Sequence, residues 1–250
     1  MTASRKELVK FCEDYLRVKD FEDHCVNGLQ VEGAEQVRKI ITGVSLSRKL
    51  IEAAVRRDAQ MLMVHHGLFE SQVKKPPRLT GYLKDRMKLL MAHDLNLCGF
   101  HLPLDAHPEI GNNISLCRWL GVGKDRKKYD IGFIGELKRP MLFNDFVGLV
   151  NRKLGVKAYA LNSGPAKVKK VGIVSGGASS WFPGAVAAGA DTYLCGEIQE
   201  PVVRMAEELK ANYISAGHYN TEKLGIRNLG ELVARKFKVE VEFVDIPCEI

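Results

Sequence analysis

The sequence lacks the patterns that mark several large classes of protein. Its 250 residues contain no hydrophobic run near the roughly 20 residues that a membrane-spanning helix needs, so we expect no membrane span. The first residues include no apolar segment typical of a secretory signal. None of the six cysteines lies in a C-x-x-C pair, which argues against a zinc ribbon or a thioredoxin-type motif. These absences predict a protein of the reducing cytoplasm without a membrane partner.

A loop for binding a triphosphate is also absent. No G-x-x-x-x-G-K-[ST] motif occurs in the chain. The segment "SGGASS" at 175–180 follows a predicted strand and could hold an anion with its backbone N–H groups, or form only a tight turn between strand and helix. The sequence therefore contains no motif that selects a nucleotide as ligand.

The composition is ordinary, with a moderate basic excess. Hydrophobic residues make up 46% and charged residues 27% of the chain, which is enough apolar material for a substantial core. The formal net charge is +7. Such a chain can bind nucleic acid or phosphorylated ligands, although many basic proteins simply have solvated lysine faces. Basic stretches at 123–128, 167–170 and 235–238 keep nucleic acid open as a partner.

Strand-like and helix-like segments alternate along the chain, which predicts an α/β fold. Residues 39–45 are rich in β-branched side chains and predict a strand, and residues 47–59 have helical spacing of apolar positions. A strand at 60–64, a helix at 83–94 and a strand at 95–100 follow. Strands that alternate with helices favour mostly parallel sheets covered on both faces.

The second half of the chain repeats the pattern of the first. Residues 37–66 align without a gap with residues 168–197, and residues 99–105 align with residues 216–222. Strand, helix, strand, helix, strand and an H-x-x-x-acid motif recur in one order, which indicates two related α/β halves. We therefore expect three parts: a first half at 1–124, an inserted strand–helix–strand segment at 125–165, and a second half at 166–250.

Polar residues that can bind metal follow the predicted strands of both halves. Ligands of α/β sheets gather beyond the carboxyl ends of the strands, where four of the seven histidines fall: His65, His66, His101 and His218. Two acidic residues come four positions after a histidine, namely Asp105 and Glu222. Because positions i and i+4 of a helical turn face the same side, each motif can present an imidazole and a carboxylate together.

This set of residues predicts a pair of metal ions. Imidazole and carboxylate ligands without a thiolate suit Zn, Fe, Mn, Co or Ni. They are too many for one tetrahedral ion and fit two ions joined by a carboxylate, either Asp105 or Glu222, and by a water that becomes a hydroxide nucleophile. The alternatives are a hydrogen-bonded pair for His65 and His66, and helix caps for the two acids.

Several stretches resemble one known family. "NGLQVEG" (27–33), "MLMVHHGLF", "GFHLPLDAHPEIGNN", "YLCGEI" and "AGHYNTEKLGIRNLGE" are similar to the GTP cyclohydrolase 1 type 2-like family, also called the NGG-one-interacting-factor-three-like family. The resemblance implies two divalent metal ions per subunit and a toroidal homohexamer with the metal sites facing an internal cavity. It also implies the metal ligands, with His101 beside them: His65, His66, Asp105, His218 and Glu222.

Two hypotheses about function follow. The first is a cytoplasmic metal-dependent hydrolase that acts on a nucleotide, a pterin or a similar small molecule, in which His101, Glu197 or His107 transfers protons. The second is a basic ring that binds nucleic acid or a protein, in which the metals have a structural role.

Overall fold

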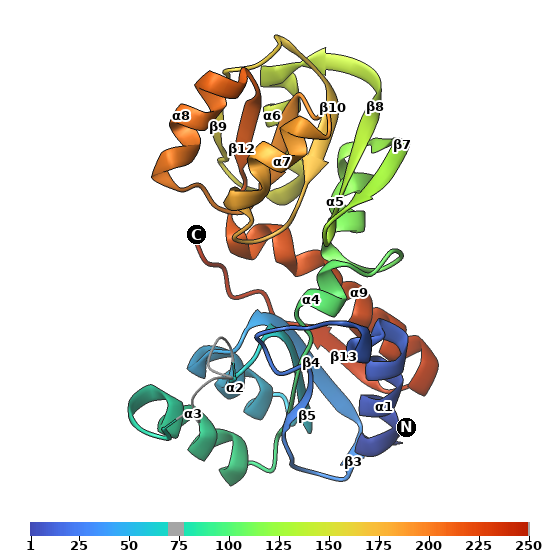
Figure 1. Ribbon diagram of the computed structural model, residues 1–250. Coiled ribbons are helices and arrows are strands. Elements are labelled where there is room, and N and C mark those ends of the chain that lie inside the picture. Colours follow the sequence, from blue (N-terminus) through green and yellow to red (C-terminus); the bar gives the residue numbers. More distant parts are fainter. Residues whose placement is uncertain (70–77, 250) are drawn as a thin grey trace. The chain divides into compact units, whose positions relative to one another are not determined.

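The computed structural model describes residues 1–69 and 78–249, which fold into two compact units. The first unit comprises Met1–Leu104 and Gly225–Ile246, and the second comprises Asp105–Leu224 and Pro247–Ile250 (Figure 1). These boundaries differ from the expected ranges 1–124, 125–165 and 166–250. Strand β13 (Glu240–Phe243) pairs in parallel with β4 (Lys39–Ser45), which places Gly225–Ile246 in the first unit. The predicted α/β class is confirmed.

A five-stranded, mostly parallel sheet forms the centre of the first unit. Its strand order is β13-β4-β5-β6-β2, with β5 at Met61–His66, β6 at Asn96–Gly99 and β2 at Gly28–Val31. Only β2 runs antiparallel to its neighbour. Strands β4, β5 and β6 are nearly continuous apolar runs because both of their faces are buried. A small antiparallel pair, β1 (Ala3–Ser4) and β3 (Gln36–Val37), is also present.

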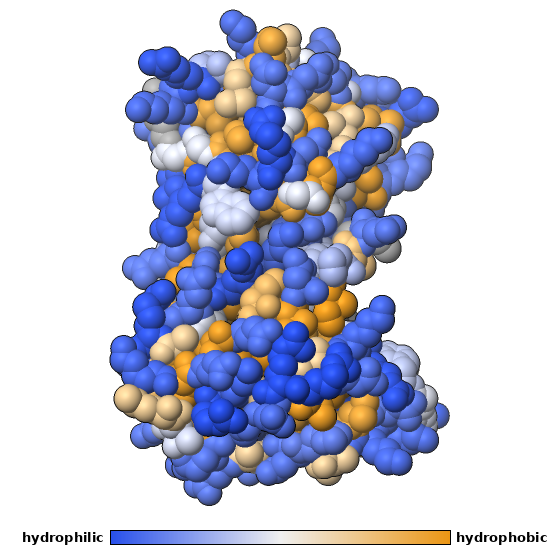
Figure 2. Space-filling view, turned by 180° about the vertical axis from the view of Figure 1, so that it is seen from behind, coloured by the Kyte–Doolittle hydropathy of each residue, from blue (hydrophilic) through white to orange (hydrophobic). Residues whose placement is uncertain are grey.

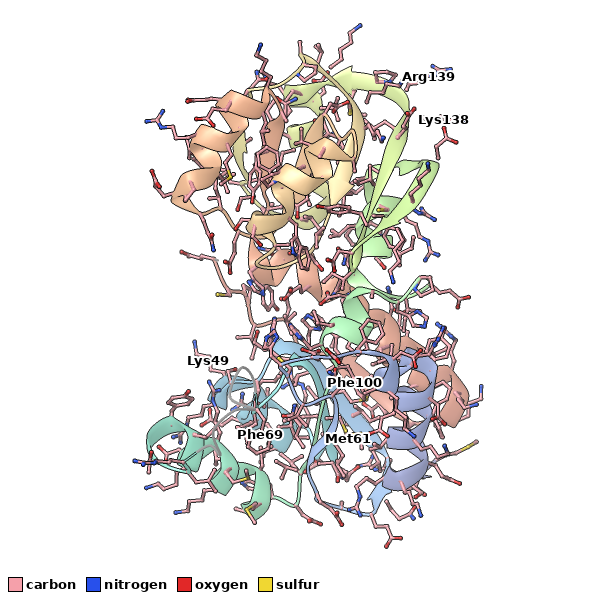
Figure 3. The ribbon with its side chains drawn as sticks, viewed as in Figure 1. Lys49, Met61, Phe69, Phe100, Lys138 and Arg139 are labelled. Atoms are coloured by element: carbon pink, nitrogen blue, oxygen red, sulfur yellow. The ribbon has the colours of Figure 1, made fainter. Side chains whose placement is uncertain are left out.

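Helices cover both faces of this first sheet. Helices α2 (Arg48–Val55) and α3 (Gly81–Ala92) lie on one side, and α1 (Arg5–Leu16) lies on the other with the later residues of α9 (His218–Phe237) (Figure 1). A short 3-10 helix, η1 (Val18–Asp20), follows α1. Figure 3 shows Met61 and Phe100 among the side chains inside this unit, where both are fully buried.

The sheet of the second unit is mixed. Its strand order is β7-β8-β10-β11-β12-β9, and β10, β11 and β12 are parallel to one another. Strands β8, β7 and β9 join antiparallel, so the expectation of a mostly parallel sheet holds for the first unit and only for the centre of the second. The strands span Val122–Tyr129 (β7), Gly132–Leu142 (β8), Tyr159–Leu161 (β9), Lys167–Ile173 (β10), Thr192–Cys195 (β11) and Asn212–Ser215 (β12).

Two separate apolar clusters bury the two faces of this second sheet. One contains residues of α5 (Asn112–Leu120) and α6 (Phe143–Leu154), and the other contains residues of α7 (Phe182–Ala187) and α8 (Glu200–Leu209). Successive residues of one strand alternate between the clusters, since Leu194 packs in the first and Tyr193 in the second. The remaining helices are α4 (Leu102–Asp105) and the 3-10 helix η2 (Ser179–Trp181).

The two sheets share a common arrangement that explains the sequence repeat. The order β4-β5-β6-β2 has three parallel strands followed by an antiparallel edge, and the order β10-β11-β12-β9 has the same directions. The aligned segments 37–66 and 168–197 correspond to β4–α2–β5 and β10–α7–β11.

Charged and polar side chains dominate the surface in the view of Figure 2, with hydrophobic patches between them. Among the described residues, no helix combines the length and the hydropathy that crossing a membrane requires.

Candidate metal centre

Three imidazoles gather at the carboxyl ends of the strands of the first unit. His65 and His66 are the last residues of β5, which extends two residues beyond the predicted strand, and His101 follows β6. The ring centroids lie 4.6 Å apart for His65 and His66, 5.1 Å for His65 and His101, and 5.4 Å for His66 and His101. Each ring offers a nitrogen within 4.8 Å of the others, so the three could hold a metal ion.

Hydrogen bonds fix the orientation of two of these rings. His65 Nδ1 lies 2.7 Å from the carbonyl oxygen of Phe100, and His101 Nδ1 lies 2.9 Å and 3.1 Å from the two carboxylate oxygens of Asp23. Because these oxygens can only accept, Nδ1 carries the proton in both rings and Nε2 keeps its lone pair. Histidines that bind metals through Nε2 show this arrangement, in which a carbonyl or carboxylate holds the other nitrogen.

Asp23 is a site residue that the sequence did not reveal. Its side chain is 3% exposed and also accepts hydrogen bonds from the Cys25 and Leu102 N–H groups, at 3.0 Å each, and from Asn27 Nδ2 at 2.9 Å. Burial raises the pKa of Asp23, but these hydrogen bonds and that of His101 outweigh it and hold the pKa below its usual value. The only sequence signal was its place, four residues before Asn27 of the "NGLQVEG" motif.

Helix α9 begins the site of the second unit. His218 is its first residue, and Glu222 follows one turn later, which brings His218 Nε2 to 3.0 Å from Glu222 Oε2. His218 Nδ1 donates to Glu197 Oε1 at 2.5 Å. Burial lowers the pKa of His218, but the hydrogen bonds and charges of Glu222 and Glu197 outweigh it and raise the pKa to about 9. His218 therefore shares with His101 a carboxylate on Nδ1, but Glu222 also faces its Nε2, so both ring nitrogens carry a proton at neutral pH.

Asp105 places a second buried carboxylate near Glu222. Each of these side chains offers an oxygen within 4.8 Å of the other, and the residues are only 2% and 3% exposed. Asp105 Oδ1 accepts hydrogen bonds from Ser175 Oγ at 2.8 Å and from Asn112 Nδ2 at 2.9 Å. Two negative charges this close and this buried repel each other strongly unless a cation or a proton compensates them.

The turn after β10 leaves room for these carboxylates. Gly176 has a φ of +67°, and a Cβ atom on it would overlap Glu222 Oε1 and lie 3.2 Å from His218 Nε2. The Gly176 N–H donates to Thr221 Oγ1 at 3.0 Å, which fixes the turn against α9. The backbone of the "SGGASS" segment thus forms one wall of the site.

The remaining candidates for proton transfer have different surroundings. Glu197 holds His218, and His101 is held by Asp23, so both lie beside potential ligands. His107 Nδ1 instead accepts from the N–H groups of Glu109 and Ile110 at 3.3 Å each, a contact within its own turn. Ser175 and Asn112 are not among the predicted ligands, although Ser175 begins the "SGGASS" segment and Asn112 lies in the "GFHLPLDAHPEIGNN" motif that carries the family resemblance.

The donor groups therefore fit divalent transition metals. The first unit offers three imidazoles, and the second offers one imidazole and two buried carboxylates. A cavity of about 680 Å³ lies in the second unit beyond the carboxyl ends of β11 and β12, and its lining includes Lys157, Tyr159, Glu197, Ser215 and Asn220. Ligand pockets commonly have this size and this position in an α/β sheet.

Comparisons with known proteins identify relatives over nearly the whole chain. The family model Duf34/NIF3 (NGG1p interacting factor 3) matches residues 3–249. A Pseudomonas aeruginosa protein named GTP cyclohydrolase 1 type 2 homolog is 38% identical over 255 residues, covering 99% of both chains. The Escherichia coli protein of that name is 38% identical over 242 residues, covering 96% of this chain and 97% of its own.

Solved structures show the same fold. A structure titled protein ybgI, unknown function, is 36% identical and has a TM-score of 0.95, covering 99% of this chain and 100% of its own. The structure of TTHA1606 from Thermus thermophilus is 33% identical with a TM-score of 0.92, again covering 99% and 100%.

Proposed function

This chain belongs to the Duf34/NIF3 family, and we propose that it is a metal-dependent hydrolase acting on a small molecule. In this proposal two divalent ions per chain, of Zn, Fe, Mn, Co or Ni, are held by the predicted ligands: His65, His66, Asp105, His218 and Glu222. On the basis of the family resemblance, the proposal includes a homohexamer located in the cytoplasm. Light scattering would measure the mass of this assembly.

One observation carries the proposal more than any other. Asp105 and Glu222 are buried carboxylates with oxygens within 4.8 Å of each other, and Glu222 also faces His218 Nε2 at 3.0 Å. A fold does not keep two neighbouring negative charges in its interior without compensation, because the cost of removing each from water is several kcal/mol. In the metal-free chain the protonated imidazole of His218 offsets one of these charges, since its pKa is about 9. Divalent cations would take the place of its Nε2 proton and offset both charges, and the imidazole completes a common ligand set.

The residues around the metal ligands would orient the imidazole rings and transfer protons. When bound, a pair of divalent ions supplies a strongly acidified water for attack on the substrate. Asp23 holds Nδ1 of His101, and Glu197 holds Nδ1 of His218, so each imidazole keeps a fixed orientation. We assign proton transfer to His101 and Glu197, because both lie next to the ligands and each already shares a proton with a neighbouring side chain.

The cavity beside Glu197 supports a nucleotide or a pterin as the substrate. Its volume of about 680 Å³ suits a nucleotide or a pterin, and its lining combines the ring of Tyr159 with the cation of Lys157. The name of these relatives, GTP cyclohydrolase 1 type 2 homolog, makes GTP the first compound to test.

Metal analysis of chain purified without an affinity tag tests the proposal. We expect a ratio near two metal ions per chain and a metal-dependent turnover of one compound in a panel of nucleotides and pterins. Glu222→Gln removes the charge of a ligand and should reduce the metal content and abolish the turnover. Glu231→Gln is the matched control, because Glu231 is on the same helix and is 64% exposed.

Two results would overturn the proposal. The first is a metal content that stays near zero after dialysis against each of the named metals. The second is turnover that persists in chelator-treated chain or in Glu222→Gln.

A further inference from the structure

The positive charge of the chain is concentrated in three neighbouring strands. Strands β7, β8 and β10 contain nine lysine and arginine residues against two acidic residues, a net charge of +7. The whole chain has the same formal net charge, +7. The formal charges of all other residues therefore sum to zero. The net positive charge of the protein comes from this part of the second unit.

Most of these cations are exposed to solvent. Seven of them form what we call the basic strand surface: Arg126, Lys127, Lys128, Lys138, Arg139, Lys167 and Lys169. Figure 3 shows Lys138 and Arg139 pointing away from the body of the unit at the end of β8. Within the described part of the chain, only Lys169 of the seven has an acidic partner, Glu136 at 3.9 Å. Lys170 is half-buried and donates to the carbonyl of Ala188, so it is not part of this surface.

Protection of a sheet edge explains only part of this surface. Lysines on an edge strand prevent pairing with other chains, and β7 is an edge strand. Strands β8 and β10 are interior in the strand order, but the pairing of β8 with β7 ends at Leu137 and the pairing of β10 with β11 begins only at Val171. Their four exposed cations lie side by side on these projecting ends, because Lys167 pairs with Leu142 and Lys170 with Glu136: Lys138, Arg139, Lys167 and Lys169. Charge of either sign would protect such ends from pairing, so the exclusively positive charge of the four needs another explanation.

We propose that the basic strand surface binds the sugar–phosphate backbone of a nucleic acid duplex. Long cations spread over adjacent strands match a regular array of phosphates, whose charges lie about 1.7 Å apart along the axis of a duplex. The surface gives no means of reading sequence, so binding depends on charge and on the shape of the backbone. This inference does not depend on the metal proposal.

The aromatic residues of these strands argue for a duplex over a single strand. Proteins that bind single strands stack bases on exposed aromatic rings. Tyr129 donates its hydroxyl to the carbonyl of Trp181, and the guanidinium of Arg126 lies over the ring of Phe133 at 5.5 Å. Both rings are partly buried, so no platform for stacking is available on the described residues of β7, β8 and β10.

Binding measured at several salt concentrations tests the proposal. We expect the full chain to bind a short DNA duplex and the RNA duplex of the same sequence more tightly than either single strand or phosphatidylserine vesicles. With up to seven phosphate contacts, the slope of log K against log salt is about −6, which means a loss of roughly 10³–10⁴-fold in affinity between 50 and 200 mM salt. The ratio of the DNA and RNA affinities shows which duplex the surface prefers.

Two variants that each lose four positive charges distinguish binding by the basic strand surface from attraction to the net charge of the chain. Changing Lys138, Arg139, Lys167 and Lys169 to Gln should make the slope about 3 to 4 units shallower. The control changes four exposed lysines of the first unit to Gln: Lys6, Lys49, Lys84 and Lys88. Equal losses in the two variants, no duplex binding at 50 mM salt, or tighter binding to single strands or vesicles would each overturn the proposal.

Discussion

At the scale of single residues, Asp23 is the clearest case of a side chain whose hydrogen bonds organise a site. We expect Asp23→Asn to lower the free energy of unfolding by roughly 1–3 kcal/mol, because the amide group cannot accept the N–H bonds that one carboxylate oxygen now receives. Denaturant unfolding at pH 7 measures the difference. Asp14→Asn is the control, since Asp14 is 60% exposed and pairs with Lys10 on the surface, and it should change stability by less than about 1 kcal/mol.

The same variant has a pH dependence whose sign follows from the lowered pKa of Asp23. A carboxylate with a lowered pKa in the folded state stabilises the protein fully above its unfolded pKa of about 3.9 and loses that contribution as the pH falls further. The stability difference between the wild-type chain and Asp23→Asn should therefore be constant from pH 7 to 5 and shrink below about pH 4. A difference that grows on acidification would contradict this assignment.

The residues that carry chemistry were easier to predict than the residues that hold them. Histidines after strands and acids at i+4 are visible in the sequence, because local geometry places them. Asp23 lies 78 residues from His101, and Ser175 lies 70 residues from Asp105. A hydrogen bond over such a separation depends on the packing of the whole unit, and no local pattern encodes it.

At the scale of elements, the turn after β10 controls how closely the backbone approaches Glu222. Gly176→Ala should destabilise the chain by roughly 2–5 kcal/mol, of which roughly 1–2 kcal/mol comes from the left-handed backbone and the rest from overlap with Glu222. It should also lower the metal content. Gly121→Ala is the matched control, because Gly121 has a φ of +72° and open space around its missing Cβ.

Unfolding curves and metal analysis of both variants separate the cost of the left-handed backbone from the cost of the overlap with Glu222. Gly121→Ala should show the backbone cost alone, with unchanged metal content. If both variants lose equal stability and keep the same metal content, the contact of Gly176 with Glu222 has no functional role.

Elements set by local patterns were predicted well, and elements set by distant pairing were not. The strand predicted at 39–45 is β4 with the same limits, since its β-branched apolar run is bounded by turn residues on both sides. The antiparallel places of β2 and β9 at the sheet edges were not predicted, because pairing partners are chosen by packing between segments far apart in the chain. The long hairpin of β7 and β8, which makes the second sheet mixed, was missed for the same reason.

At the scale of the whole molecule, strand β13 near the end of the chain pairs in the first sheet. This pairing assigns the residues around it to the first unit. The sequence repeat suggested a simple cut between halves, since repeats usually fold as consecutive blocks. The parallel pair of β13 and β4 instead places Gly225–Ile246 with the first unit. Such a pairing joins residues about 200 positions apart, and no repeat or motif in the sequence signals it.

The six cysteines allow each unit to be followed separately. All are free thiols, and Cys248 is the exposed one, whereas the others are buried. Burial raises the pKa of Cys12 and Cys117 to about 12 and that of Cys195 to about 11, so their reactive thiolate forms are scarce at neutral pH. We expect one thiol of the native chain to react rapidly with a disulfide reagent, and six to react in denaturant.

Replacing Cys248 with Ser should remove the rapid reaction and leave the slow ones unchanged. Rapid labelling of a second thiol in the native chain would contradict the burial described here. Mass spectrometry of chain labelled in rising denaturant then follows Cys12 and Cys98 in the first unit and Cys117 and Cys195 in the second. Each buried thiol becomes reactive only when its own core opens, so the denaturant concentrations at which the two pairs react measure the stability of each unit by itself.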